Sequence, residues 1–213
     1  MPDAVIIGGG PGGGTAATLL ARRGYSVVLL EREIFPRAHV GESLLPASMP
    51  VLEELGVLGQ IESENFPKKY GATMVWGRDD TPWSWYFRET NRTYPHAYQV
   101  SRPRFDQILL DNAKSSGVDV RENCNVFETL SDSESGAIHG VRYRRDNGIV
   151  ESVEADFVMD ASGQSALLAR SMNLRTWDTF FQNLAVYGYY RGAKRLPSPD
   201  ETNIFIESYG QGW

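Results

Sequence analysis

Six glycines and one proline fill residues 8–14, directly after a short apolar run at residues 4–7. The run is rich in β-branched residues and has no polar position, which is typical of a strand buried on both faces. Helical spacing of apolar residues follows over 15–22, and a second apolar run at 27–30 ends in an acid, Glu31. The order strand, glycine turn, helix, strand predicts a βαβ unit at the start of an α/β fold.

Three of these glycines, Gly8, Gly10 and Gly13, occupy the spacing G-x-G-x-x-G. In a dinucleotide-binding unit the first allows a tight turn, the second lets the backbone approach a pyrophosphate, and the third lets helix and strand pack closely. Glu31 lies 23 positions after Gly8, where an acid accepts hydrogen bonds from ribose hydroxyls. The context predicts a nucleotide site. A glycine-rich βαβ unit without a nucleotide is the alternative, and the motif does not separate NAD from FAD.

Composition excludes several classes of protein. The chain has 21 Lys and Arg residues and 27 Asp and Glu residues, so its net charge is −6. It lacks the excess of basic residues that is typical of proteins that bind nucleic acid or an anionic membrane. No apolar stretch is long enough for a membrane span or a signal sequence. The single cysteine, Cys124, favours a reducing, cytoplasmic setting. The three histidines lie far apart and show no metal-ligand spacing, so no metal is predicted.

Three later segments bear on the choice between NAD and FAD. The segment Gly-Glu-Ser at 41–43 precedes a predicted helix over 46–55. A second segment, 98–102, precedes a predicted helix from about Phe105 to Ala113, and a third, 156–163, is a predicted strand that ends in Asp-Ala-Ser-Gly. Alternating runs with Ser-Gly and Asn-Gly turn signals lie between the last two segments and predict an antiparallel meander over 118–130, 138–145 and 149–155.

This order resembles the flavoprotein hydroxylase family, in which a Rossmann-type FAD-binding domain carries a β-meander insert. The resemblance implies an α/β fold of that kind, the start of an antiparallel-sheet substrate domain, and FAD as the cofactor. It puts Glu31 at the ADP half, and Arg102, Asp160 and Gly163 near the pyrophosphate and ribityl chain. A surface cation and a strand-end cap are the alternatives for Arg102 and Asp160. The candidate FAD-binding residues are Gly8, Gly10, Pro11, Gly13, Glu31, Arg32, Arg37, Ser43, Arg102, Asp160 and Gly163.

Four sequence segments resemble one particular group of these flavoenzymes. They read GESLLP at 41–46, FPKKYGATMVWG at 66–77, YQVSRPRFD at 98–106 and NLAVYGYY at 183–190. Together they look like flavin-dependent halogenases of secondary metabolism, in the branch that acts on phenols, pyrroles or carrier-bound aromatic groups. The resemblance implies that reduced FAD, oxygen and chloride or bromide give hypohalous acid, which a lysine relays to an electron-rich aromatic substrate. It also implies that a separate flavin reductase supplies the reduced FAD.

The family lysine matches Lys69, and its neighbour Lys68 is the second candidate. A nucleophilic amine needs a depressed pKa, which burial would give. The competing interpretation is a solvated pair of lysines, because lysines are rarely buried. The nearby aromatic residues Trp83 and Trp85 alternate, so both indoles should lie on one face of a strand. They predict either a substrate-pocket wall or the packing of a sheet.

The resemblance divides the chain into an FAD-binding domain over 1–180 and the beginning of a substrate domain over 181–213. Residues 70–98 would contribute to the substrate-side sheet, and alternating runs at 184–190 and 203–207 predict further strands there.

Family members carry a W-x-W-x-I-P motif near the flavin, and the ending Gly-Gln-Gly-Trp makes Trp213 its first tryptophan. We therefore expect residues 1–213 to be the front portion of a longer enzyme, without catalytic competence by itself. Three other functions stay open at this level: an FAD-dependent aromatic hydroxylase or epoxidase, a flavin-dependent prenyl reductase, and a nucleotide-binding protein without catalysis.

Overall fold

A computed structural model describes residues 1–76, 80–210 and 212. Gly77 and Trp213, which belong to two of the sequence motifs above, lie outside the described residues. The chain divides into two compact units, which are described separately. The first comprises Met1–His39 and Arg102–Gln182, and the second comprises Val40–Ser101 and Asn183–Trp213. Residues 40–101 are thus grouped with the C-terminal segment. The sequence-based assignment put them within the FAD-binding domain, with residues 70–98 contributing to the substrate-side sheet.

A four-stranded parallel sheet forms the centre of the first unit. Its strand order is β11 (Phe157–Asp160), β1 (Ala4–Ile7), β2 (Val27–Leu30) and β7 (Asp119–Arg121), and every neighbouring pair is parallel. All four residues of β1 and of β2 are buried, as the unbroken apolar runs predict. The chain passes from β1 to β2 through one helix, which is the predicted βαβ unit.

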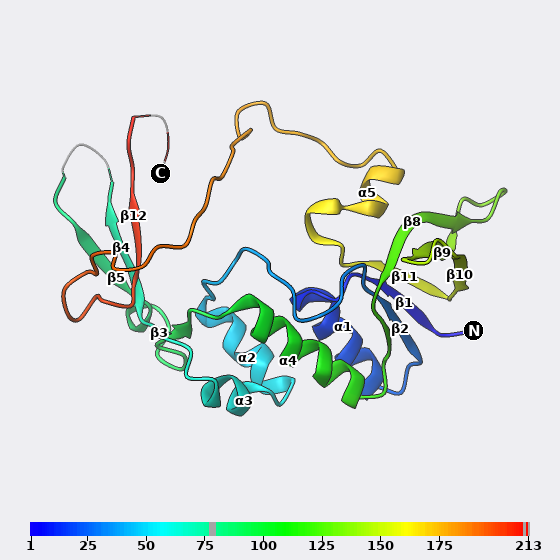
Figure 1. The fold of residues 1–213 in the computed structure, drawn as a ribbon, viewed down its shortest axis with the longest axis horizontal. Helices are drawn as coiled ribbons and strands as arrows, with labels where there is room; N and C mark the ends of the chain where they lie inside the picture. Colours follow the sequence, from blue (N-terminus) through cyan, green and yellow to red (C-terminus); the bar gives the residue numbers. More distant parts are fainter. Residues whose placement is uncertain (77–79, 211, 213) are drawn as a thin grey trace. The chain divides into compact units, whose positions relative to one another are not determined.

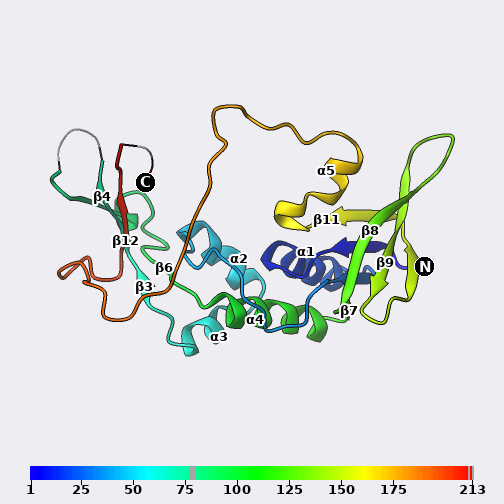
Figure 2. The same ribbon diagram turned by 45° about the horizontal axis from the view of Figure 1, so that its top comes forward.

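The two faces of this sheet are covered by different elements. Helices α1 (Pro11–Arg22) and α4 (Arg102–Ser115) lie side by side (Figures 1 and 2), and they pack on the face that carries Ile6 and Leu29. The face that carries Val5 and Val28 packs against the meander through Tyr143 and other buried residues. Because the strands are buried on both faces, successive side chains of β1 pack alternately into two hydrophobic clusters, one on each face of the sheet.

The meander consists of β8 (Cys124–Ser131), β9 (Ile138–Arg145) and β10 (Val150–Glu154), paired antiparallel in the order β10-β9-β8. The prediction of one continuous strand over 118–130 is wrong. Its first part is β7 of the parallel sheet, and the chain turns at Asn123, whose φ of 63° lies in the left-handed region that asparagine tolerates.

Both long helices begin earlier than the apolar spacing indicates. Helix α1 starts at Pro11, inside the glycine run, with Gly10 as an extended N-cap. Proline at the first helical position has a fixed φ and needs no amide donor there, so it starts the helix despite the glycines. Helix α4 starts at Arg102, before the expected start near Phe105. Helix α1 ends at Arg22, and Gly24 follows with a φ of 90°, in the left-handed region that glycine favours after a helix.

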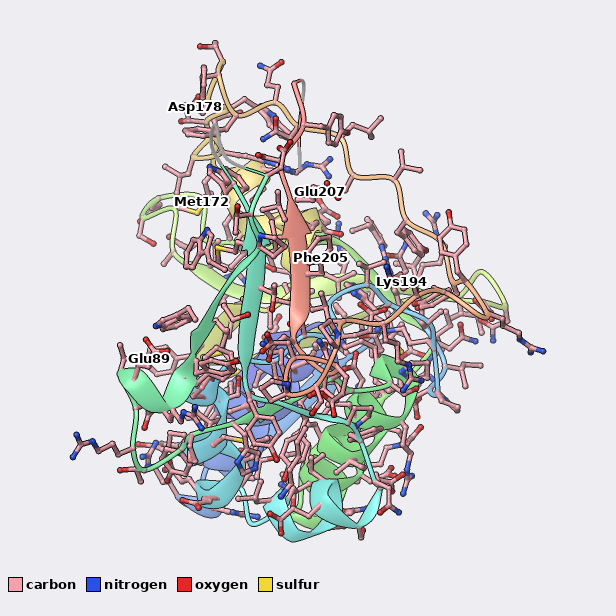
Figure 3. The ribbon with its side chains drawn as sticks, turned by 90° about the vertical axis from the view of Figure 1, so that its left-hand side faces the viewer. Glu89, Met172, Asp178, Lys194, Phe205 and Glu207 are labelled. Carbon is pink, nitrogen blue, oxygen red and sulfur yellow. The ribbon has the colours of Figure 1, made fainter. Side chains whose placement is uncertain are left out.

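The second unit contains short helices and two small sheets. A 3₁₀ turn, Pro46–Ser48, leads into α2 (Met49–Glu54), and α3 (Leu58–Ser63) follows. Strand β3 (Lys68–Lys69) pairs antiparallel with β6 (Ala97–Tyr98). The other sheet has the order β12 (Ile204–Glu207), β4 (Gly71–Val75), β5 (Trp83–Tyr86), with β4 antiparallel to β5 and parallel to β12. Figure 3 shows Phe205 and Glu207 on β12, beside β4.

The strand predicted over 184–190 is wrong. No strand is described between residues 183 and 190, and both Leu184 and Val186 are 90% exposed. An alternating pattern becomes a strand only where another strand supplies hydrogen-bond partners and an apolar face, and the described residues offer this segment neither. Among the helices that the structure describes, none is long and apolar enough to cross a membrane.

Candidate functional site

A cavity of about 770 Å³ opens in the first unit where β1, β2 and β11 end. Their last residues, Ile7, Leu30 and Asp160, line it. The carboxyl end of a parallel sheet is where open α/β folds bind ligands. Nine of the eleven candidate FAD-binding residues line this cavity: Gly8, Gly10, Pro11, Glu31, Arg32, Arg37, Arg102, Asp160 and Gly163.

The glycine turn is packed too tightly for side chains at two of the motif positions. Gly8 has a φ of 103°, and a Cβ there would lie 2.6 Å from the carbonyl oxygen of Ala161. A Cβ on Gly13 would lie 1.9 Å from the carbonyl oxygen of Gly8. Gly13 is not among the cavity-lining residues, and it acts by letting α1 approach the turn. A Cβ on Gly12 would meet no atom within 4 Å.

The Glu31 carboxylate, which directly follows β2, hydrogen-bonds to the backbone of this turn. Glu31 is 4% exposed, and its Oε2 accepts a hydrogen bond of 2.6 Å from the amide of Gly9. Its Oε1 accepts one of 2.8 Å from the amide of Glu33. Each carboxylate oxygen keeps a further lone pair, so Glu31 can hold the loop and still accept a hydroxyl hydrogen. The glycine motif predicts a ligand contact for Glu31 and carries no signal for its bond to the Gly9 amide.

Two arginines meet on one buried carboxylate that the sequence analysis assigned no role. Asp106 is fully buried. Arg102 binds it with two hydrogen bonds, Nε to Oδ1 at 2.8 Å and Nη2 to Oδ2 at 2.9 Å. The Nη1 of Arg37 donates to the same Oδ2 at 3.1 Å. The interpretation of Arg102 as a surface cation is wrong, since the residue is 8% exposed.

This cluster carries positive charge at the cavity wall. Arg37 also lies 3.4 Å from Glu33, and Arg32 is an exposed partner of Glu33 at 3.5 Å. The first turn of α1 has no acidic side chain, and its residues Pro11 and Gly12 line the cavity. Guanidinium groups and a helix N-terminus together suit a phosphate group. The residues present therefore fit an anionic dinucleotide.

Asp106→Asn should destabilise the first unit by about 3–5 kcal/mol, because it removes the buried negative charge that two largely buried guanidinium groups share. The matched control is Asp111→Asn on the same helix, where the exposed carboxylate bonds Gln107 and the change should cost less than about 0.5 kcal/mol. Urea unfolding measures both. Equal stability of the two variants would contradict the structural role of Asp106.

Asp160 makes the contacts of a strand-end cap. Its Oδ1 accepts from the amide of Ser162 at 2.9 Å, and its Oδ2 accepts from the amide of Leu168 at 2.8 Å. These bonds hold the loop that contains Gly163, whose φ is 61°. The capping interpretation therefore describes the local geometry, and the carboxylate still borders the cavity.

Lys69 and Ser43 lie in the second unit, where they contact each other. The Nζ of Lys69 donates to the Oγ of Ser43 at 2.6 Å and lies 5.2 Å from the centre of the Phe87 ring. Lys69 is 2% exposed, and burial lowers the pKa of its amine. No carboxylate pairs with it among the described residues. Lys68, the other candidate, is exposed. The interpretation of both lysines as solvated is wrong, because Lys69 is buried.

Backbone pairing explains why these two residues meet. Residues 97–100 pair with β3 on one side, where Lys69 faces Ala97 in register. On the other side the amide of Leu44 donates to Tyr98 and the amide of Val100 donates to Glu42. The segments around Ser43 and Lys69 therefore flank one common strand. Of the two tryptophans on β5, Trp83 is 50% exposed, whereas Trp85 packs edge-on against Phe87 with ring centres 5.5 Å apart.

Comparison with known proteins gives consistent matches. Residues 1–194 match the family described as FAD binding domain. A tryptophan 2-halogenase from Chondromyces crocatus is 36% identical over 98% of this chain and 39% of its own length. The 1H-pyrrole-2-carbonyl-[peptidyl-carrier protein] chlorinase of Pseudomonas fluorescens is 35% identical over 96% of this chain and 49% of its own length.

Solved structures agree with these matches. The myxobacterial chondrochloren halogenase CndH has a TM-score of 0.87 and 42% identity, covering 98% of this chain and 48% of that one. The flavin-dependent halogenase CmlS has a TM-score of 0.74 and 40% identity over 83% of this chain and 32% of that one. The chain thus spans half or less of the length of these proteins.

Proposed function

This chain belongs to the FAD-binding-domain family, and from that premise we propose that it works in a flavin-dependent halogenase. Membership agrees with the predicted Rossmann-type fold and the predicted FAD cofactor. The relatives named above are halogenases, which favours halogenation over the hydroxylase and prenyl reductase alternatives. The proposed reaction uses reduced FAD, oxygen and chloride or bromide, and it places the halogen on an electron-rich aromatic ring.

The proposed FAD site is the cavity of the first unit. Arg37 and Arg102 would face the pyrophosphate, together with the amide groups at the start of α1. Glu31 would accept hydrogen bonds from the adenosine ribose with the lone pairs that the loop leaves free. When bound in reduced form, FAD supplies the electrons that activate oxygen. The tight packing at Gly8 and Gly13 keeps the backbone turn narrow enough for a phosphate to approach.

The burial of Lys69 carries the proposal of halogenation. Lys69 is 2% exposed, and among the described residues its amine is hydrogen-bonded only to a hydroxyl, so it does not serve as a surface charge. Its amine can hold hypohalous acid by a hydrogen bond, or take the halogen while hydroxide leaves with an amine proton as water. Transfer to the aromatic ring then replaces a ring proton. Burial favours this chemistry, because it keeps competing water away and lowers the pKa of the amine.

A halide-dependence assay tests the function. The catalytically active enzyme that contains this chain is supplied with reduced FAD, oxygen and a panel of phenols and pyrroles, with and without chloride or bromide. We expect halogenated product that requires the halide. Oxygenated product with a yield indifferent to halide would instead identify a hydroxylase.

Glu31→Gln should weaken FAD binding by about 10–150-fold, which corresponds to the loss of one charge-assisted hydrogen bond of about 1.5–3 kcal/mol. The amide would also present an N–H to one of the two backbone donors that the carboxylate now holds. Flavin fluorescence titration measures the affinity. Glu128→Gln, at an exposed ion pair of the meander, is the control and should bind FAD normally. Unchanged affinity in Glu31→Gln would mean that Glu31 is not at the ribose.

The substrate and partners extend the same proposal. One relative acts on a pyrrole group held by a peptidyl-carrier protein, so a small aromatic substrate bound to a carrier is one candidate class. A separate flavin reductase would supply the reduced FAD, as the resemblance to flavin-dependent halogenases implies. The proposed cytoplasmic setting rests on the single cysteine, Cys124, which is buried and free. Assaying free and carrier-loaded pyrroles side by side distinguishes the two substrate forms.

A further inference from the structure

We propose that Ser43 is a positioning residue for Lys69, and that it aims the lysine amine rather than binding the cofactor. This inference rests on the proposed function, because it assigns Ser43 a task in the lysine-dependent step. The observation behind it is the 2.6 Å hydrogen bond from Lys69 Nζ to Ser43 Oγ. That bond is the one polar contact of the amine within the described part of the chain.

The backbone holds Ser43 in place from both sides. Ser43 forms an antiparallel bridge with Gln99, and the residues before and after it are bonded to the same strand. A serine side chain has one rotatable bond to its oxygen, so a fixed backbone leaves Oγ few positions. Lys69 itself is fixed by β3 and rests over the Phe87 ring. The donor and the acceptor therefore belong to paired backbone segments on either side of residues 97–100.

A hydroxyl partner suits a lysine that must react. By accepting one N–H, Ser43 directs the remaining N–H and the lone pair of a neutral amine away from itself, towards the halogen. A carboxylate in its place would favour the ammonium form, which has no lone pair. Serine is uncharged, so it orients the amine without the strong preference for the ammonium form that a carboxylate would impose.

The charged and titratable groups on the elements around Lys69 make their described contacts with residues other than Lys69. The Glu42 carboxylate is occupied by the Tyr189 hydroxyl at 2.7 Å and by the amide of Gly41. Lys68 is exposed, and Glu89 bonds the amide of Tyr86. Four more such groups lie on the neighbouring segments: Tyr70, Arg88, His96 and Tyr98. Arg88 lies over the Tyr86 ring. The rings of Tyr70 and Tyr98 both contact the His96 ring.

The test compares Ser43→Ala with Ser43→Thr, which restores a hydroxyl. We expect Ser43→Ala to lower kcat for halogenation by about 10–100-fold and to leave FAD affinity and the oxidation of reduced FAD unchanged. Ser43→Thr should return kcat to within about threefold of the original. Halogenation by Ser43→Ala at the original rate would overturn the proposal. Weaker FAD binding in Ser43→Ala would overturn it too, because Ser43 would then be the cofactor contact that the sequence suggested.

A measurement without turnover separates this inference from the proposed function. The Cε resonance of Lys69 is followed by NMR in protein labelled with ¹³C-lysine, and its assignment comes from its absence in Lys69→Met. The proposal expects the resonance and its pH midpoint to move in Ser43→Ala and to be restored in Ser43→Thr. An unmoved resonance would refute the contact. If the resonance responds but no halide-dependent product forms, the proposed function fails while the contact between Ser43 and Lys69 stands.

Discussion

Gly13→Ala is expected to prevent FAD binding and to destabilise the first unit by about 3 kcal/mol or more. The new Cβ would lie 1.9 Å from the Gly8 carbonyl oxygen and 3.3 Å from the Ala161 side chain. Neither neighbour can move freely, because the Gly8 amide is bonded to Leu30 and the Ala161 amide to Ile7. Relief of the clash therefore requires α1 to shift away from the turn that lines the cavity.

The control for Gly13→Ala is one residue away. Gly12 lies in the same helical turn, and a Cβ there meets no atom within 4 Å. Gly12→Ala should stabilise the protein by about 0.5–1 kcal/mol, because alanine loses less backbone entropy in a helix. Gly12 lines the cavity, so this variant is a control for stability and not for FAD binding. Urea unfolding compares the stability of the two variants, and flavin titration measures FAD binding by Gly13→Ala. Equal stability of the two variants would show that the close approach at Gly13 does not determine the turn.

The part of the fold that follows from local pattern was predictable. Strands β1 and β2 are continuous apolar runs bounded by strong signals, and the turn between β1 and α1 is fixed by its glycines. Errors arose where pairing is decided elsewhere in the chain. The run over 118–130 alternates throughout, yet Asn123 divides it between two sheets. Alternation alone cannot say which sheet will accept a strand.

The same limit applies to the site. Nine candidates gather at the cavity because the ends of parallel strands meet there, which a topology argument can foresee. Asp106 was missed because its importance depends on two arginines 69 and 4 positions away that converge on it. Composition cannot say which of Lys68 and Lys69 is buried. The answer depends on which face of β3 is covered by the rest of the second unit, and that face carries Lys69.

Lys69→Met should abolish halogenation, lowering its rate by about 10²–10⁴-fold, while reduced FAD is still oxidised at the original rate. Methionine keeps most of the volume of the lysine stem beside Phe87 and removes only the amine. The free energy of unfolding should change by no more than about 1 kcal/mol, because the lost bond is to a partly exposed hydroxyl. Product analysis, flavin absorbance and urea unfolding together measure the three quantities.

Lys68→Met is the matched control, since the two lysines are adjacent on β3 and only one is buried. An exposed lysine that serves as a solvated charge can be lost without effect on the reaction, so Lys68→Met should halogenate normally. The reverse result, with activity lost in Lys68→Met and kept in Lys69→Met, would transfer the catalytic role to the exposed lysine. Activity kept in both variants would remove Lys68 and Lys69 from the mechanism. The buried amine would then have to be explained as a structural partner of Ser43 alone.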